Sequence, residues 1–460
     1  MSKDDEQPLW AGRFGKPPAP EARALGASLA FDIRLAPQDV EASIAHVRGL
    51  EEAGLLAPDE ATALEDALRE VQSAIADGVF DVHASDEDVH SAIERGVTER
   101  LGDLGARLHA GRSRNDLVVA DLRLWLLAAG RRIEGLTGLL ARALVDRARQ
   151  HAATVMPGTT HARLAQPVTL GHHLLAHAWG LVRDLERFAE WRDRTAVSPL
   201  GAGALATTTL PLRPDAIARR LGFDRAFSNS IDAVSDRDFV LEFCADAAIL
   251  GMHLSRLAAD LARWTDEGIA WAQLDEAYST GSSMMPQKRN PDVAELVRAK
   301  AARPSSDFAR VAAMLQGLPL GYHRDLQEDK EAAFDAADTL EACLAATVGA
   351  VETVRFDPPA MRAAAEQESL YATDLAEALV LAGVPFREAH RRTGALLKSL
   401  EEDGRSLRDL SPEEWTSFGV VDGPAYLDPD RAVAARGGPG GPSSESVLTQ
   451  ATAIERALGG

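Results

Sequence analysis

The chain has 460 residues, of which 46% are hydrophobic and 5% aromatic. This composition excludes general disorder, and a core poor in aromatics but rich in Ala and Leu favours helices packed on helices. The formal net charge of −21 argues against nucleic-acid or membrane partners, because an acidic surface repels phosphate. Two cysteines, no long apolar stretch and no basic-then-apolar N-terminus together predict a protein of the reducing cytoplasm.

The N-terminal part reads as short helices over residues 39–78, broken by turns at Ala53-Gly54 and Ala57-Pro58. The run Ser85-Asp86-Glu87-Asp88 matches a capping box, a pattern that starts a helix. Further along, apolar residues at helical spacing follow Leu136 and again follow Pro167. We therefore expect long amphipathic helices in the middle of the chain.

A third long helix is predicted from Arg237 to Trp264, opened by a capping box at Ser235 and Asp238. It would be about 42 Å long, longer than usual in globular proteins, which indicates a helical bundle shared between subunits. After Phe356 the stretches of apolar residues at helical spacing become shorter. The prediction is an all-α fold with a long central bundle and smaller terminal helical domains, divided at residues 1–110, 111–357 and 358–460.

The most informative segment is Gly281-Ser282-Ser283-Met284-Met285-Pro286-Gln287-Lys288-Arg289-Asn290-Pro291. Its small residues suit a loop, and Asn290 with Pro291 suits the N-cap and first position of a helix. A serine that acts as a base needs its alkoxide stabilised, which Lys288 and nearby backbone N–H groups can provide.

This segment resembles the shared loop of the fumarase/aspartase superfamily. Further motifs resemble the argininosuccinate lyase family within it, and the resemblance runs from Trp10-Ala11-Gly12-Arg13-Phe14 nearly to the C-terminus. The additional motifs are Gly111-Arg112-Ser113-Arg114-Asn115-Asp116, Thr160-His161, Ser235-Asp236-Arg237-Asp238-Phe239, Asp325-Leu326-Gln327-Glu328-Asp329-Lys330-Glu331, Ala372-Thr373-Asp374 and Gly383-Val384-Pro385-Phe386. The resemblance implies a homotetramer in which three chains form each active site, and elimination of fumarate from a succinyl compound.

The resemblance implies Ser282 as the base, His161 as the acid, Glu295 as the partner of His161, and Lys288 with Asn290 as stabilisers of the carbanion. The substrate that the resemblance implies, argininosuccinate, carries three carboxylates, which arginine and lysine side chains can bind by charge-assisted hydrogen bonds. The expected substrate-binding residues are Ser28, Ser113, Arg114, Asn115, Thr160, Arg237, Asn290, Tyr322, Gln327 and Lys330. No cofactor and no metal are expected.

Some positions depart from the family pattern, and they keep two alternatives open. Ala162, Arg163 and Leu164 replace Leu-Gln-Arg after the histidine, Leu117 replaces Gln, and His323 replaces Asn. These changes affect the side of the pocket that would hold the leaving amine. One alternative is therefore a related C–N lyase acting on another N-substituted aspartate, and the less favoured one is a non-catalytic structural relative.

Two other patterns resemble binding motifs, but a purely structural role is favoured for each. Gly201-Ala202-Gly203-Ala204-Leu205-Ala206 fits a dinucleotide-binding fingerprint, but Thr207-Thr208-Thr209-Leu210-Pro211 follows where a helix is required. His173 and His177 share a helix face and have the spacing of metal ligands. Because no glutamate-containing zinc motif accompanies them, packing is the favoured interpretation.

Overall fold

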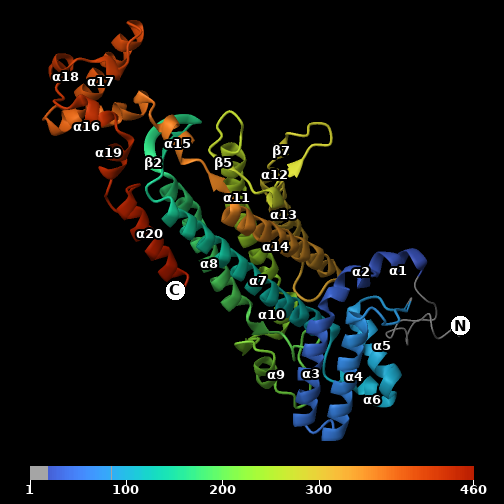
Figure 1. The fold of residues 1–460 in the computed structure, drawn as a ribbon. Coiled ribbons are helices and arrows are strands. Elements are labelled where there is room, and N and C mark those ends of the chain that lie inside the picture. Colours follow the sequence, from blue (N-terminus) through green and yellow to red (C-terminus); the bar gives the residue numbers. More distant parts are fainter. Residues whose placement is uncertain (1–18, 84, 460) are drawn as a thin grey trace. The chain divides into compact units, whose positions relative to one another are not determined.

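The structure, a computed structural model, describes residues 19–83 and 85–459. The Trp10–Phe14 motif lies outside them. The predicted all-α class is confirmed, since long helices dominate and the strands are short (Figure 1). The longest helices are α7 (Arg114–Gln150), α8 (Leu170–Thr195), α11 (Asp238–Trp264) and α14 (Asp329–Thr353). The long helix expected to end at Trp264 is therefore present and begins one residue later than predicted.

The chain folds into two compact units, each built from three separate segments. Among the described residues, unit 1 comprises those of 1–133, 187–248 and 303–339, and unit 2 comprises those of 134–186, 249–302 and 340–460. Four of the five boundaries between the units fall within α7, α8, α11 and α14, and the fifth falls between residues 302 and 303, just before the helix that begins at Arg303. The three consecutive domains expected from the sequence stay a prediction.

Unit 1 holds the N-terminal helices, and α3 packs along α4 in it (Figure 1). Its other elements are α1 (Pro20–Gly26), α2 (Leu29–Asp32), α3 (Ala36–Glu52), α4 (Pro58–Ala76), α5 (Val89–Leu101), α6 (Asp103–Ala106), α9 (Pro214–Arg220), α10 (Ser230–Ser235), α13 (Arg303–Leu315), β3 (Val197–Ser198) and β4 (Arg225–Ala226). One apolar cluster joins α3, α7 and α9 around Leu200 and Ile217. The helices of residues 39–78 are longer than expected, because the turns at Gly54 and Pro58 are their only breaks.

Unit 2 contains an antiparallel hairpin that the sequence analysis did not predict, made by β1 (Val155–Thr160) and β2 (Arg163–Thr169). Because β2 continues to Thr169, α8 begins at Leu170 and not at Pro167. The other elements are β5 (Ala272–Gln273), β6 (Thr280–Gly281), β7 (Arg289–Asn290), β8 (Arg355–Phe356), α12 (Asp292–Lys300), α15 (Pro358–Ala365), α16 (Ala372–Leu381), α17 (Phe386–Glu402), α18 (Pro412–Phe418), α19 (Pro429–Ala434) and α20 (Ser444–Ala457).

The C-terminal helices of unit 2 have an apolar core of their own. Helices α16 and α17 pack together, and Tyr371 and Trp415 are among the buried side chains between the short helices. This agrees with the shorter helical pattern expected after Phe356. In the parts of the chain that the structure describes, no helix is both long and apolar enough to cross a membrane.

Two predicted capping boxes are wrong in detail. Helix α5 starts at Val89 and is capped by Asp88, whose carboxylate accepts from the Ser91 N–H at 2.8 Å. At the start of α11, Asp236 accepts from the Asp238 N–H at 2.7 Å, because Ser235 already ends α10. In both places an aspartate, which accepts but does not donate when ionised, takes the role expected of a serine.

Candidate active site

The loop that carries Ser282 is the turn of a small antiparallel hairpin. Thr280 and Gly281 in β6 pair with Asn290 and Arg289 in β7, and the loop between them projects from its unit (Figure 1). Two further contacts hold the base of the hairpin: the Thr280 hydroxyl donates to Asp292, and Arg289 pairs with Glu276 at 2.7 Å. The loop therefore has a defined base although most of its residues are exposed.

Backbone N–H groups converge on the Ser282 hydroxyl. Ser282 Oγ accepts hydrogen bonds from the N–H of Met284 at 3.2 Å and of Met285 at 3.0 Å. Two donors on one oxygen stabilise the negative charge that forms when the hydroxyl loses its proton. Backbone donors near Ser282 are expected from the sequence, but these two could not be identified from it, since the motif does not give the direction of an N–H group.

Asn290 lies at the other end of the same hairpin. It is half-buried and lines a cavity of about 480 Å³ together with Gln287, Arg289 and Pro291. The prediction of its capping role is wrong: Asn290 belongs to β7, Pro291 is the N-cap, and α12 begins at Asp292. The strand pairing takes Asn290 out of the helix, and its amide side chain is not needed for capping.

His161 occupies the tip of the β1–β2 hairpin. Thr160 pairs with Arg163, so that His161 and Ala162 form a two-residue turn with φ of 52° and 59°. Positive φ at both positions is the pattern of a type I′ turn, which matches the twist of the strands. All four side chains are exposed, and His161 is thus presented at the end of a defined hairpin.

Glu295 is exposed on the first turns of α12. Its ion-pair partner is Arg298, one turn further along, at 4.0 Å. Its expected pairing with His161 stays a prediction. Lys288 is also exposed, at the end of the Ser282 loop.

In unit 1, the Arg112–Asp116 motif forms the start of α7 and is organised by Asp116. The buried Asp116 carboxylate accepts from the N–H of Ser113 at 3.0 Å, of Gly201 at 3.1 Å and of Gly203 at 2.8 Å. Burial raises the pKa of Asp116 to about 6, against the opposing effect of these hydrogen bonds. The segment that resembled a dinucleotide fingerprint is thus a turn wrapped around a carboxylate.

This turn also positions Asn115. The Asn115 side chain donates to the carbonyl of Ala204 at 3.1 Å, and the Ser113 hydroxyl accepts from the Asn115 N–H at 3.2 Å. Both residues are half-buried. The structure therefore brings Ser113 and Asn115 together at the first turn of α7.

Ser28 and Arg114 each contact the turn before α5. The Ser28 N–H donates to the carbonyl of Glu87 at 2.7 Å, and Arg114 pairs with Asp88 at 3.1 Å. Burial opposes ionisation of Asp88, but the charges of His90 and Arg114 outweigh it and hold its pKa below the usual value. Ser28 itself is buried and donates to Asp32 at 2.6 Å.

Arg237 and Lys330 converge on Asp329 in the interior of unit 1. Arg237 Nε donates to Asp329 Oδ2, and Lys330 Nζ donates to Asp329 Oδ1 at 3.0 Å. The side chains of Arg237 and Asp329 are 0% exposed, and that of Lys330 is 3% exposed. These contacts give both cations a structural role, and their contact with substrate stays a prediction.

Tyr322 and Gln327 flank this cluster in sequence and are half-buried. The N–H of Gly321 donates to the Ser235 hydroxyl at 2.6 Å, which holds the segment before Tyr322 against the end of α10. Gln327 lies in a short 3₁₀ helix, Arg324–Glu328, that leads into α14. The expected site residues thus divide between the units, with Thr160, His161, Ser282, Lys288, Asn290 and Glu295 in unit 2 and the others in unit 1.

Comparison with known proteins gives matches along nearly the whole chain. A family model described as "Lyase" matches residues 12–304, and one described as "Argininosuccinate lyase C-terminal" matches residues 369–434. The argininosuccinate lyase of Frankia casuarinae is 48% identical over 458 residues, covering 98% of both chains. That of Moorella thermoacetica is 48% identical over 454 residues, covering 98% of this chain and 97% of the relative.

Solved structures give the same architecture. An EDDS lyase in complex with formate superposes with a TM-score of 0.84 at 29% identity, covering 96% of this chain and 90% of that one. A class II fumarase from Schistosoma mansoni has a TM-score of 0.76 at 14% identity, covering 90% and 94% of the two chains. The second similarity shows the fold alone.

Proposed function

The chain belongs to the argininosuccinate lyase family, and we propose that it catalyses the reversible elimination of arginine from argininosuccinate to give fumarate. The observation that carries the proposal is the Ser282 hydroxyl with two N–H donors directed at its oxygen. The identity of nearly half the residues with argininosuccinate lyases over the whole chain supports the choice of substrate.

In this reaction Ser282 takes a proton from the carbon next to a carboxylate. Lys288 and Asn290 stabilise the negative charge that spreads onto that carboxylate. The electron pair then forms the double bond of fumarate as the C–N bond breaks. His161, or a water that it polarises, gives a proton to the departing guanidine nitrogen, and Glu295 of the assembled enzyme orients His161. No cofactor takes part in these steps.

A direct assay tests the proposed activity. Purified protein is mixed with argininosuccinate, and fumarate and arginine are both measured. We expect the two products in equal amounts. Release of neither product by the folded, assembled protein would refute the proposal and favour the non-catalytic alternative.

We further propose that the enzyme is a cytoplasmic homotetramer acting in arginine biosynthesis. Its two cysteines are both buried, which suits a reducing compartment. The distribution of expected site residues over two units, with His161 and Ser282 on separate projecting hairpins, is compatible with sites completed by neighbouring chains.

Complementation of inactive variants tests shared active sites. A Ser282→Ala chain and a His161→Asn chain should each be inactive, yet reassembled mixtures should regain activity, because some sites receive both intact residues. Activity is measured before and after reassembly, with each variant reassembled alone as the control. Verified mixed tetramers that stay inactive would contradict the shared site.

Arg163 provides a test of amine selectivity. It lies across the hairpin turn from Thr160, is exposed, and stands where the family has Gln. If it faces the pocket of the assembled enzyme, its charge repels a cationic amine. Arg163→Gln should then raise kcat/KM for argininosuccinate relative to more acidic N-substituted aspartates. Arg225→Gln, an exposed arginine on β4, is the control, and an unchanged substrate ranking would place Arg163 outside the site.

A further inference from the structure

Unit 2 contains a second polar pocket, between the first half of α8 and the second half of α11. Its volume is about 370 Å³. Its polar lining consists of His173, His177, Arg183, His253, Arg256 and Asp260. None of these residues belongs to the set proposed for the elimination.

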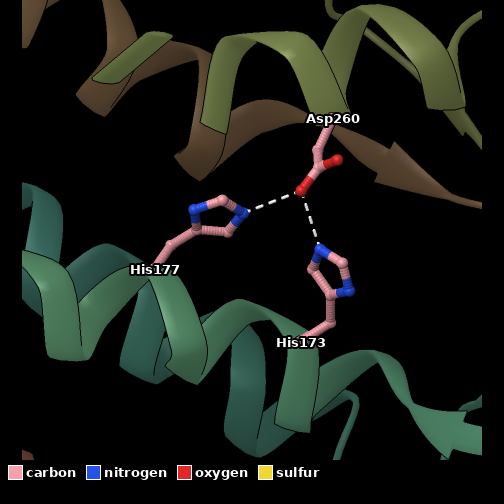
Figure 2. Close-up of side chains that lie close together, drawn as sticks. All are labelled: His173, His177 and Asp260. Atoms are coloured by element: carbon pink, nitrogen blue, oxygen red, sulfur yellow. Dashed lines mark hydrogen bonds and ion pairs between the residues drawn. The ribbon is translucent and has the colours of Figure 1, made fainter. Parts of the chain in front are cut away.

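Three of these side chains converge on one point (Figure 2). His173 Nε2 lies 2.7 Å and His177 Nε2 lies 2.9 Å from the same oxygen, Oδ2 of Asp260. The histidines are four residues apart on α8, which places both imidazoles on one face. Asp260 comes from α11, 83 residues after His177, so its contact with the two histidines could not be predicted from their spacing.

Packing against Trp264 restrains the His173 side chain. The His173 ring contacts the Trp264 ring edge-on, with 5.1 Å between centroids, and Trp264 is one turn beyond Asp260 on the same helix. The side chains of His173, His177 and Asp260 are 31%, 14% and 30% exposed, so an ion can reach them from the pocket. The cluster is thus held in place and accessible.

We propose that His173 Nε2, His177 Nε2 and Asp260 Oδ2 form a binding site for a divalent transition-metal ion such as Zn²⁺ or Co²⁺. Two imidazole nitrogens and one carboxylate oxygen are a ligand set that these ions prefer. The three donor atoms lie within 4.8 Å of one another. Bonds of about 2.0–2.1 Å in a tetrahedron separate ligand atoms by about 3.3 Å, and small side-chain rotations reach that spacing from the observed 2.7 and 2.9 Å.

Two arginines near the proposed ligands influence which further ligand would bind the ion. Arg183 and Arg256 line the same pocket, and their positive charges favour an anion over water at the open position of the metal. Metal binding requires an ionised carboxylate and two unprotonated Nε2 atoms, so the ion would take the place of the two contacts that join the histidines to Asp260.

His253, which also lines the pocket, pairs with a different carboxylate and provides a control. His253 Nδ1 lies 2.6 Å from Asp184 Oδ2, one imidazole to one carboxylate. It is outside the three-residue cluster. A variant of His253 removes an imidazole from the pocket but leaves the proposed ligands intact.

Cobalt binding tests the site. The full-length protein, freed of metals with a chelator, is titrated with Co²⁺ near neutral pH. We expect intense visible absorption bands typical of tetrahedral Co²⁺, saturating at one ion per chain and removed by added Zn²⁺. His173→Gln, His177→Gln and Asp260→Asn should each abolish the bands, while His253→Gln should keep them; circular dichroism checks that all variants are folded.

Other outcomes refute the site. Absence of the bands in the parent protein would do so, as would bands that survive loss of a proposed ligand in a folded variant. Equal loss of the bands in His253→Gln would place the ion elsewhere in the pocket. Because the readout is the metal spectrum, failure of the proposed elimination would leave this result unaffected.

Discussion

Replacing Ser282 with alanine should lower kcat by about a thousandfold or more, within the range that general-base catalysis contributes. Affinity for argininosuccinate should stay nearly unchanged, because the hydroxyl acts mainly in the transition state. The hydrogen bonds from the Met284 and Met285 N–H groups to Ser282 Oγ are the reason to expect a large effect. Single-turnover kinetics and calorimetric binding measure the two quantities separately.

Ser283→Ala is the matched control, since it removes the adjacent, exposed hydroxyl from the same loop. It should retain most of the activity. Near-normal turnover in Ser282→Ala, or an equal loss in both variants, would remove Ser282 from its proposed role as the base.

The second large effect concerns stability. Asp329→Ala should lower the free energy of unfolding by about 3–5 kcal/mol, because it leaves Arg237 and Lys330 buried without the carboxylate that both contact. Chemical denaturation at a fixed protein concentration, followed by circular dichroism, measures the change.

Asp338→Ala on the same helix is the control. Asp338 is 55% exposed and pairs with Arg34 at 2.7 Å, and an exposed ion pair contributes about 1 kcal/mol or less. If Asp329→Ala is no more destabilising than Asp338→Ala, the buried contacts of Asp329 with Arg237 and Lys330 do not stabilise unit 1.

The sequence predicted those features that depend on local pattern. The helix ending at Trp264 follows from its apolar spacing, and the Ser282 loop from its small residues. The β1–β2 hairpin around His161 was not predicted, because the Ala-rich composition favours helices throughout the chain. The turn His161-Ala162 also lacks the glycine that usually marks positive φ.

Contacts between residues far apart in the sequence could not be predicted from local motifs. Arg237 was expected to bind a carboxylate of the substrate. In the structure it forms a buried ion pair with Asp329, which lies 92 residues later in the sequence. The Gly111–Asp116 motif resembles the family pattern, but its residues alone do not indicate that Asp116 accepts from the N–H groups of Gly201 and Gly203. In each case tertiary packing brings the carboxylate to its hydrogen-bond partners, and a short sequence motif does not show which residues those are.

The reverse reaction tests the central claim most directly, because it identifies the amine as well as the chemistry. Fumarate is incubated with the protein and a panel of amines that includes arginine, diamines and acidic amino acids, and the adducts are identified by mass spectrometry. We expect argininosuccinate as the dominant product, and Ser282→Ala should not form it. Preferential addition of another amine, with no arginine adduct above the protein-free level, would contradict the proposed function.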